Sequence, residues 1–508
     1  MTRLVVAAYA APRAVSDVLD ALREEMEIAA EYPPEAAHDI AAVDESEFPD
    51  RRDIPFITID PPGARDLDQA MHLSREGEGY LVRYAISAVG LFVPPGGPLD
   101  EETRHRGLTF YGPDGSIPLH PLSLSHGSAS LRAGEDRPAY IWYLHLDAAG
   151  RLTHSWVEWG RVRSRAQLTY DDVQGALDGT GDLPGEVPAD LPQLLADIGT
   201  RRLALERDRG GISLDLPEQR VVESESGYRL SYRANTDVDE WNAQISLLTG
   251  MAAADMMSLG GIGLLRTLPA AAEKDYARLR RVARALDLHW PEDVDYPTFV
   301  RSLDSANGSH AAFLTQATTL FRGASYAPLG VDMPGKKGAR QAEEPLEHAA
   351  IAARYAHVTA PLRRLVDRFG LEVCRCLCAG EEIPGWVTAA LPELPAIMAR
   401  ASQRASAYES AAINAIEALI LQGREGEIFE AVVVDCTSGR RAKRVGNKGT
   451  VMLREPAVMA TVTGENLPLG ETVRVRLAKV TPAAVSFELV EDESVEDEAG
   501  EARAGHGR

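Results

Sequence analysis

The sequence predicts a multidomain α+β protein, and three observations support that prediction. At 508 residues the chain is too long for a single ordinary core. Residues 54–160 show the turn-punctuated pattern of strands. Residues 168–421 change to helical spacing, and residues 427–490 return to short strands. A strand-rich unit followed by helices and then by a second strand-rich unit is typical of separate layers and domains.

The elements are expected in a definite order. Residues 13–31 have the apolar spacing of an amphipathic helix, and a polar linker follows them. The segment "FITID" leads into an acidic loop and then a hairpin, and a second strand pair with a Gly-containing turn lies over residues 139–164. Shorter helices occupy the middle of the chain. Two long helices are expected around residues 361–379 and 389–421.

The C-terminal strands predict a small barrel. Five short strands with turn signals between them fit the oligonucleotide/oligosaccharide-binding fold. The cluster "RRAKRVGNK" at residues 440–448 is either a phosphate-binding patch or a solvated hairpin loop. The charge block "EDESVEDEAGE" cannot bury a core, so residues 491–508 are expected to be a disordered tail.

Composition narrows the functional classes. A mean hydropathy of -0.19 and the lack of any apolar run of bilayer length predict a soluble, cytoplasmic protein that begins at its native N-terminus. The net charge of -23 argues against a surface coated in nucleic acid, but it leaves room for an internal basic channel. Three of the four cysteines form "CRCLC", which we interpret as small buried residues on a helix in a reducing compartment.

One acidic loop carries the first chemical signal. In "ITIDPPGARDLDQAM" the aspartates Asp60, Asp66 and Asp68 converge if Asp60 ends a strand and the others lie on the returning loop. Hard carboxylate oxygens suit Mg²⁺ or Mn²⁺, with substrate phosphate and water completing the shell. The alternative is a solvated turn whose side chains cap backbone amides. An EF-hand calcium loop is not indicated, because its twelve-residue pattern is absent.

A basic segment far along the chain carries the second signal. In "YAHVTAPLRRLVDR" a helix is expected to begin at or near Pro361, which places Arg363 and Arg364 at its positive end, where phosphate binds. Arg368 is expected on a solvated helix face, and Asp367 is expected to pair with either of the two preceding arginines.

An aromatic pair precedes a rigid turn between these two segments. In "LTFYGPDGSIPLHPLSLS" the side chains of Phe110 and Tyr111 stand before a turn rich in Gly and Pro. Aromatic side chains on such a loop can stack on a nucleobase, although they are more often part of a core.

Taken together, these segments resemble the ribonuclease II (RNB) family of processive 3′→5′ exoribonucleases. "TIDPPGARDLDQA" resembles the family's metal loop, "FYGPDGSIPLHP" its tyrosine segment, and "YAHVTAPLRRLVD" its arginine signature. "YESAAINAIEALIL" stands where the family has a helical glutamate. The resemblance covers residues 46–425. It implies a catalytic domain with a mixed β-sheet and surrounding helices, and residues 426–490 look like the family's S1 domain.

The resemblance also implies roles for side chains at the matching motif positions. The residues implied to hold Mg²⁺ (Mn²⁺ as the alternative) are Asp60, Asp66, Asp68 and Gln69; those implied to act in catalysis are Asp66, Asp68 and Arg363; those implied to bind RNA are Tyr111, Glu409, Arg364, His357 and Thr359.

The chain departs from the family at several positions. Gln69 replaces a fourth aspartate, Ala88 another acid and Ala360 a serine, while Leu248 and Thr249 stand for paired glutamates. Typical members also carry two cold-shock barrels before the catalytic domain, and residues 1–45 fit only a short helical segment.

Three functions follow as hypotheses. The first is processive hydrolysis of single-stranded RNA from its 3′ end to nucleoside 5′-monophosphates by a monomeric cytoplasmic enzyme with no membrane association. The second is a catalytically weakened RNA-binding protein that retains the fold, which Gln69 and Ala88 motivate. The third is a phosphodiesterase acting on DNA or small nucleotides, against which Glu409 argues, because it would contact ribose 2′-hydroxyls.

Overall fold

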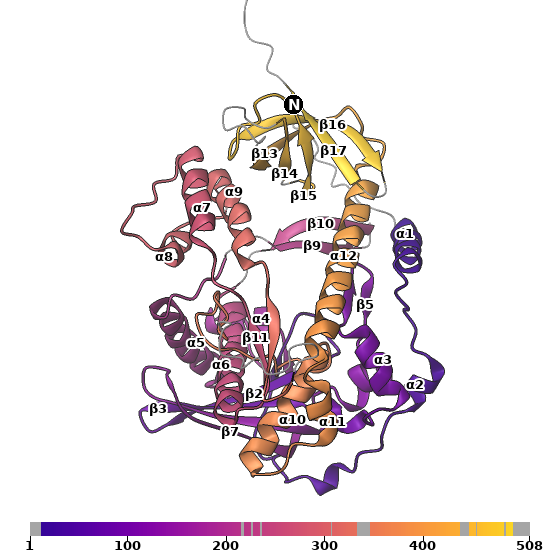
Figure 1. Ribbon diagram of the computed structural model, residues 1–508, viewed down its shortest axis with the longest axis vertical. Helices are drawn as coiled ribbons and strands as arrows, with labels where there is room; N and C mark the ends of the chain where they lie inside the picture. The colour runs from indigo at the N-terminus through magenta and orange to yellow at the C-terminus, as the bar shows by residue number, and fades with distance from the viewer. Residues whose placement is uncertain are drawn as a thin grey trace, which may run out of the picture.

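The protein consists of a broad base and a small barrel joined by one long helix, α12 (Leu394–Leu421), as Figure 1 shows. No helix in the described ranges is long and apolar enough to cross a bilayer. The computed structural model describes residues 12–490 except 215–217, 225–226, 234–235, 306, 333–345, 437–446, 454 and 482–483.

A four-stranded antiparallel sheet forms the base. Its strands pair in the order β2-β3-β6-β7, and Gly77 with a φ of 57° makes the tight turn between β2 and β3. A separate parallel pair joins β1 (Thr58–Ile59) to β8 (Gln167–Leu168). The strands of the sheet are β2 (Gln69–Glu76), β3 (Gly79–Ser87), β6 (Asp136–Leu146) and β7 (Leu152–Arg163).

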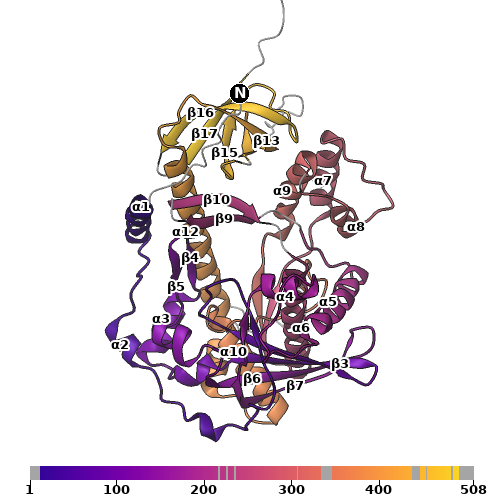
Figure 2. The same ribbon diagram turned by 180° about the vertical axis from the view of Figure 1, so that it is seen from behind.

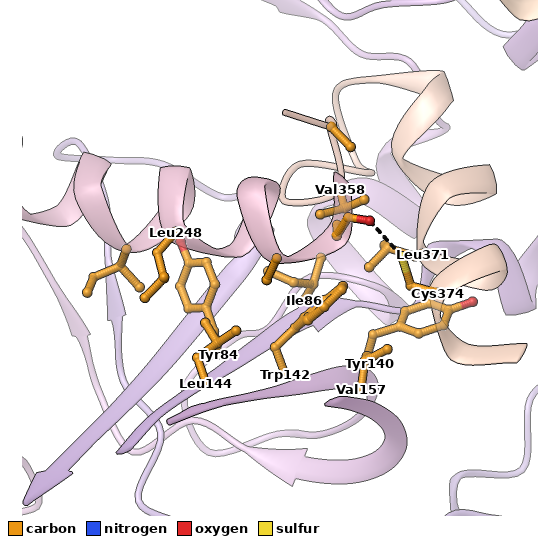
Figure 3. Packing of buried hydrophobic residues seen from close by; sticks show 14 of the residues in the cluster. Tyr84, Ile86, Tyr140, Trp142, Leu144, Val157, Leu248, Val358, Leu371 and Cys374 are labelled. Carbon is orange, nitrogen blue, oxygen red and sulfur yellow. Dashed lines mark hydrogen bonds between the residues drawn. The ribbon is translucent and has the colours of Figure 1, made fainter. Parts of the chain in front are cut away.

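Helices cover one face of this sheet and enclose the largest core. Figure 3 shows Tyr84 and Trp142 of the sheet facing Leu248 of α6 and Leu371 of α10. Apolar residues on alternate strand positions produce this layer, because alternate side chains of a strand point to the same face. The helices of this part are α4 (Tyr170–Leu177), α5 (Leu191–Asp208), α6 (Asp237–Gly260), α10 (Leu365–Ala379) and α11 (Gly385–Ala390).

Shorter elements surround the base. The N-terminal helix α1 lies beside the upper part of α12 in both Figures 1 and 2. The remaining helices are α1 (Pro12–Glu25), α2 (Pro34–His38), η1 (Glu45–Glu47), η2 (Val89–Phe92), α3 (Pro98–Arg106), η3 (Leu124–Ser128), α7 (Glu273–Ala285), α8 (Tyr296–Arg301), α9 (Gly308–Ala317) and η4 (Thr318–Phe321), and the remaining strands outside the barrel are β4 (Phe110–Gly112), β5 (Gly115–Ile117), β9 (Glu218–Ser224), β10 (Gly227–Arg233), β11 (Gly263–Thr267) and β12 (Ser325–Leu329).

The C-terminal strands close into the expected five-stranded barrel, paired in the order β13-β14-β15-β17-β16. Phe429 and Phe487 meet edge to face in its core, with ring centroids 5.8 Å apart. The basic cluster at residues 440–448 falls largely, and the acidic tail at 491–508 entirely, outside the described residues. The strands are β13 (Ile428–Cys436), β14 (Lys448–Leu453), β15 (Val458–Thr463), β16 (Thr472–Thr481) and β17 (Ala484–Leu489).

Two predictions about helix α10 are wrong. The helix begins at Leu365 and not near Pro361, because residues 361–364 form a turn whose backbone bonds to other segments. Arg368 is not solvated: it is 2% exposed and forms an ion pair of 2.7 Å with the buried Asp100. Every residue from Leu365 to Cys376 is buried, so this part of the helix has no solvated face.

Other differences are smaller. The N-terminal helix ends at Glu25 rather than near residue 31. In "CRCLC" Cys374 and Cys376 are buried as predicted, but Cys378 is exposed. The strand pairs β9–β10 and β11–β12 were not predicted, because they interrupt a region whose dominant pattern is helical.

Candidate functional site

The acidic loop leaves strand β1 and returns as strand β2. Asp60 extends the β1–β8 pairing, since its amide donates to the Leu168 carbonyl at 3.0 Å. Gly63 has a φ of 81°, a conformation that favours glycine, and it allows the chain to reverse. The buried Leu67 then anchors the returning segment, where its carbonyl accepts a hydrogen bond from the Leu131 amide. This path brings Asp66 close enough to Asp60, and to Asp68, for their charges to interact.

Asp68 is the point at which the acidic loop meets the basic segment. The amide of Leu362 donates to Asp68 Oδ1 at 2.7 Å, and Arg363 Nε lies 3.7 Å from Asp68 Oδ2. Asp68 is only 4% exposed, and burial raises its pKa well above the usual range, although Arg363 and the Leu362 amide lower it. A cation near this carboxyl would therefore favour its charged form.

The turn that carries Arg363 is held by its neighbours. Asp367 accepts the Ala360 amide at 2.7 Å, and the carbonyl of Arg363 accepts the Thr109 amide at 3.1 Å. Arg364 donates twice to Asp367, at 3.0 and 2.8 Å, so Asp367 pairs with the second of the two arginines. Arg363 is 44% exposed and lies beside Asp68.

Asp60 and Asp66 supply the remaining carboxylates. Burial raises the pKa of Asp60 to about 7, and the nearby charge of Asp66 adds to that rise. Asp60 Oδ2 is buried and has no hydrogen-bond partner among the described residues. In the described part of the chain, no three His, Cys, Asp or Glu side chains are gathered tightly enough to hold an ion by themselves. The loop nevertheless fits a divalent cation, because such an ion would neutralise the mutually repelling acids, bind the unpartnered Asp60 oxygen and complete its shell with water and phosphate.

Gln69 joins the two halves of the site. Its side-chain Nε2 donates to the carbonyl of Thr359, and its Oε1 accepts a hydrogen bond of 3.0 Å from the hydroxyl of Tyr84. A carboxylate at this position would have no hydrogen to donate to Thr359. The Gln69 amide therefore bridges Thr359 and Tyr84 in a way that an aspartate could not. The second lone pair of Oε1 is not used by these two hydrogen bonds.

The positions predicted to bind RNA lie in two environments. His357 is partly buried and Thr359 is buried, and both contact other side chains. Tyr326 Oη lies 2.8 Å from His357 Nδ1, and the hydroxyls of Ser246 and Thr359 lie 2.8 Å apart. Burial, with help from nearby arginines, lowers the pKa of His357 well below its ordinary value, so the ring is neutral at pH 7.

Tyr111 and Glu409 are exposed. Tyr111 is 48% exposed on strand β4, while its neighbour Phe110 is buried. Desolvation raises the pKa of the Tyr111 hydroxyl to about 12, Arg363 opposes the rise, and the charges of Asp66 and Asp68 add to it, which places this hydroxyl beside the acidic loop. Glu409 is exposed on α12, directly after the buried Tyr408.

Some residues of the site were not predicted. Tyr84 and Ser246 hold Gln69 and Thr359, but they lie on a strand and a helix whose patterns indicate only core packing. Leu248 and Thr249 of α6 are buried, and Ala88 is buried as well. No local signal distinguishes such supporting residues, because their partners lie far away in the sequence.

The fold and the site define an RNB-domain protein with a C-terminal S1 domain. Residues 49–370 match the RNB domain, and residues 427–491 match the RNase II-type exonuclease C-terminal S1 domain. The first match alone covers more than half of the chain, so the chain belongs to the RNB family.

Its relatives include ribonucleases R. The chain is 27% identical over 509 residues to Ribonuclease R of Aquifex aeolicus, covering 93% of this chain and 70% of that protein. It is 30% identical over 331 residues to Ribonuclease R of Escherichia coli, covering 63% of this chain and 39% of that protein. The matches therefore span only part of the length of these two relatives.

Solved structures share the fold. The apo form of Mycoplasma genitalium RNase R superimposes with a TM-score of 0.81 at 16% identity, over 94% of this chain and 78% of that one. Yeast Ssd1, described as a pseudonuclease, gives a TM-score of 0.67 at 15% identity, over 91% and 57% of the two chains. At these identities the likeness establishes the architecture alone.

Proposed function

We propose that this protein is a 3′→5′ exoribonuclease that hydrolyses single-stranded RNA processively to nucleoside 5′-monophosphates, acting as a cytoplasmic monomer. The observation that carries the proposal is the junction at Asp68, where the acidic loop and the Arg363 turn meet through a 2.7 Å hydrogen bond. Carboxylates on one side and an exposed guanidinium on the other suit a phosphodiester, because both the attacking water and the phosphate charge then have partners.

The acidic side chains would bind the metal ion, and Arg363 would bind the phosphate. Asp60, Asp66 and Asp68 would hold Mg²⁺, with Gln69 contributing at most the free lone pair of Oε1. When bound, the ion would supply Lewis-acid polarisation of the phosphate and a more acidic water. Arg363 would donate to the phosphate oxygens as negative charge develops on them.

The RNA-binding roles follow from exposure. Tyr111 would stack on the 3′-terminal base, and Glu409 would accept from ribose 2′-hydroxyls. Arg364, His357 and Thr359 are held by protein partners, so they would support RNA binding by shaping the site, and Arg364 would be the one of the three that adds positive charge near the phosphate.

A labelled-RNA assay tests the proposal. RNA labelled at its 5′ end and incubated with Mg²⁺ should shorten to a ladder that collapses to a short core, while Asp68→Asn should leave it intact. A DNA oligomer of the same sequence is the control for ribose recognition. Full-length RNA after incubation with the wild-type protein, in conditions where a known exoribonuclease degrades it, would refute the activity.

A second candidate function is an RNA-binding protein without turnover. Gln69 favours it, because its amide bridges Thr359 and Tyr84 in the position of a family acid. This alternative predicts salt-sensitive RNA binding that is unchanged by Asp68→Asn and no ladder from the wild type. The same two proteins in a binding titration and in the ladder assay therefore separate the two functions.

A further inference from the structure

The N-terminal helix α1 contacts the β4–β5 hairpin, which carries Tyr111, through Arg23. Arg23 Nε donates to the hydroxyl of Tyr408 at 3.0 Å, and its Nη2 donates to Asp114 Oδ1 at 2.6 Å. Asp114 lies in the turn of the β4–β5 hairpin, and Tyr408 lies on α12. The side chains of Arg23 and Asp114 are 15% and 22% exposed, so this ion pair is partly buried at the surface.

The hairpin depends on such outside support. Each of its strands has three residues, and an isolated two-stranded hairpin is marginally stable at best in water. Its inner face packs Phe110 and Ile117 against Ile28 and the fully buried Tyr408. A Cβ atom on Gly112 would lie 2.8 Å from the Tyr408 hydroxyl, which shows how closely the hairpin backbone approaches α12.

The same helix is fixed at its other end. Val15 and Leu19 of α1 are buried in a cluster shared by α12 residues such as Ile416 and by the barrel, and Figures 1 and 2 show α1 alongside α12 and near the hairpin. The position of the Arg23 guanidinium is therefore set by the packing of α1 rather than by the hairpin that it holds.

From this arrangement we infer that Arg23 is a positioning residue for RNA: it fixes the β4–β5 hairpin to α12 and thereby sets where Tyr111 meets the 3′-terminal base. The inference rests on the proposed function only in taking Tyr111 as the stacking residue. Strand alternation explains the effect, since Phe110 faces the support and Tyr111 faces the opposite side. Movement of the hairpin would displace Tyr111, while Glu409 would stay in place on α12.

Base stacking can be measured without turnover. An RNA with 2-aminopurine as its 3′-terminal base, bound to full-length protein carrying Asp68→Asn, reports stacking through fluorescence quenching. Adding Tyr111→Ala defines the unstacked signal. We expect Arg23→Ala to lose at least half of the quenching that Tyr111→Ala loses, and Arg23→Lys to recover part of it. Arg13→Ala is the matched control, because Arg13 is an exposed arginine of the same helix with no partner among the described residues.

A kinetic measurement in the otherwise wild-type protein complements this test. Because base stacking on an aromatic ring contributes about 1–3 kcal/mol per base, we expect Arg23→Ala to raise KM for RNA on the order of tenfold. The variant Asp114→Asn removes the other partner of the ion pair and should shift quenching and KM in the same direction.

The outcomes separate this inference from the proposed activity. Absence of turnover in the wild type would refute the exoribonuclease, yet the quenching series would still report the position of Tyr111. Quenching by Arg23→Ala equal to that of the parent protein would overturn the inference, and so would a Tyr111→Ala variant that quenches normally. Should Arg23→Ala fold poorly by circular dichroism, Asp114→Asn decides on the same two criteria.

Discussion

Asp68 and Asp60 carry the same carboxyl group in different surroundings. Asp68 accepts a backbone amide and faces Arg363, whereas one oxygen of Asp60 is buried without a hydrogen-bond partner among the described residues. Asp68 is thus tied to the basic turn, and Asp60 has spare capacity for a cation. A substitution of Asp68 therefore tests catalysis, and a substitution of Asp60 tests the pH dependence of stability.

Replacement of Asp68 by Asn should abolish catalysis while preserving the fold. The Asn oxygen can still accept the Leu362 amide, but the charge opposite Arg363 is lost. We expect kcat for RNA to fall by roughly 10²–10³-fold or more, in line with the loss of one electrostatic contact to a transition state. Single-turnover cleavage measures this fall. A variant that retains over half of the wild-type rate would contradict the assignment of Asp68.

The raised pKa of Asp60 predicts a pH dependence of stability. The folded protein binds the Asp60 proton more tightly than the unfolded chain does, since its pKa rises from 3.8 to about 7. The free energy of unfolding contributed by this group should therefore decrease as pH rises from about 4 to about 7. Urea titrations in EDTA should show a flatter pH profile for Asp60→Asn than for the wild type. Parallel profiles would rule this out.

At the scale of elements, Gln69 links strand β2 to the segment that precedes the arginine turn. Its amide donates to the Thr359 carbonyl and accepts from Tyr84 on β3. This link explains why an amide is tolerated in an otherwise acidic loop: it joins two segments that a carboxylate would push apart.

The variant Gln69→Glu should be less stable than the wild type. It keeps the shape of the side chain but removes the donor to Thr359, which costs about 1–3 kcal/mol when a buried acceptor loses its partner. Chemical denaturation in EDTA at pH 8 measures the change. Gln403→Glu on the exposed surface of α12 is the matched control. Equal unfolding free energies for the two variants would argue against a bridging role.

A buried ion pair connects helices α3 and α10. Arg368 and Asp100 are each 2% exposed and lie 2.7 Å apart, and Arg368 also donates to the Val93 carbonyl at 3.0 Å. After Arg368→Ala, Asp100 keeps the partly exposed Arg104 at 3.2 Å but loses its buried partner, so the free energy of unfolding should fall by up to roughly 3–5 kcal/mol. The double variant Arg368→Met/Asp100→Leu should recover most of that loss. A loss below about 1 kcal/mol in the single variant would show that the pair is solvated.

At the scale of the whole molecule, α12 connects the four-stranded sheet and its helices to the S1 barrel. Ile416 and Leu421 of α12 share a buried cluster with Val15 and Leu19 of α1 and with the barrel strands. Another cluster joins the barrel to α7–α9 through Val432 and Val434. The barrel is thus packed on two sides and is not attached merely by a linker.

Removal of the barrel should therefore destabilise the rest of the chain. A protein ending at residue 426 exposes Ile416 and Leu421, and each apolar side chain of this size contributes about 1.5–3 kcal/mol when buried. We expect a lower thermal midpoint and increased binding of a hydrophobic dye compared with the full chain. A truncated protein with an unchanged midpoint would indicate that the barrel is an independent unit.

The sequence was a good guide to the strands of the four-stranded sheet and to the returning path of the acidic loop. Alternation over residues 69–87 and 136–163 marks strands, because one face of each must be buried. The spacing of Asp60, Asp66 and Asp68 around Gly63 indicated a loop returning on itself. The start of α10 was misjudged, since proline at a first turn is only a statistical preference, and the structure uses residues 361–364 for contacts with Asp68 and Thr109.

The amino-acid sequence alone specified the chemical groups that are available: carboxylates on a tight turn, two adjacent arginines, and an aromatic side chain before a rigid turn. Tertiary structure decided which of them act together. In the fold, Arg364 pairs with Asp367, and Arg363 stays exposed beside Asp68. Gln69 joins the acidic loop to the segment before the arginine turn through the Thr359 carbonyl. The physical reason is sequence separation. Asp68 and Leu362 are 294 residues apart, and only the burial of the sheet against α6 and α10 brings them within hydrogen-bond distance.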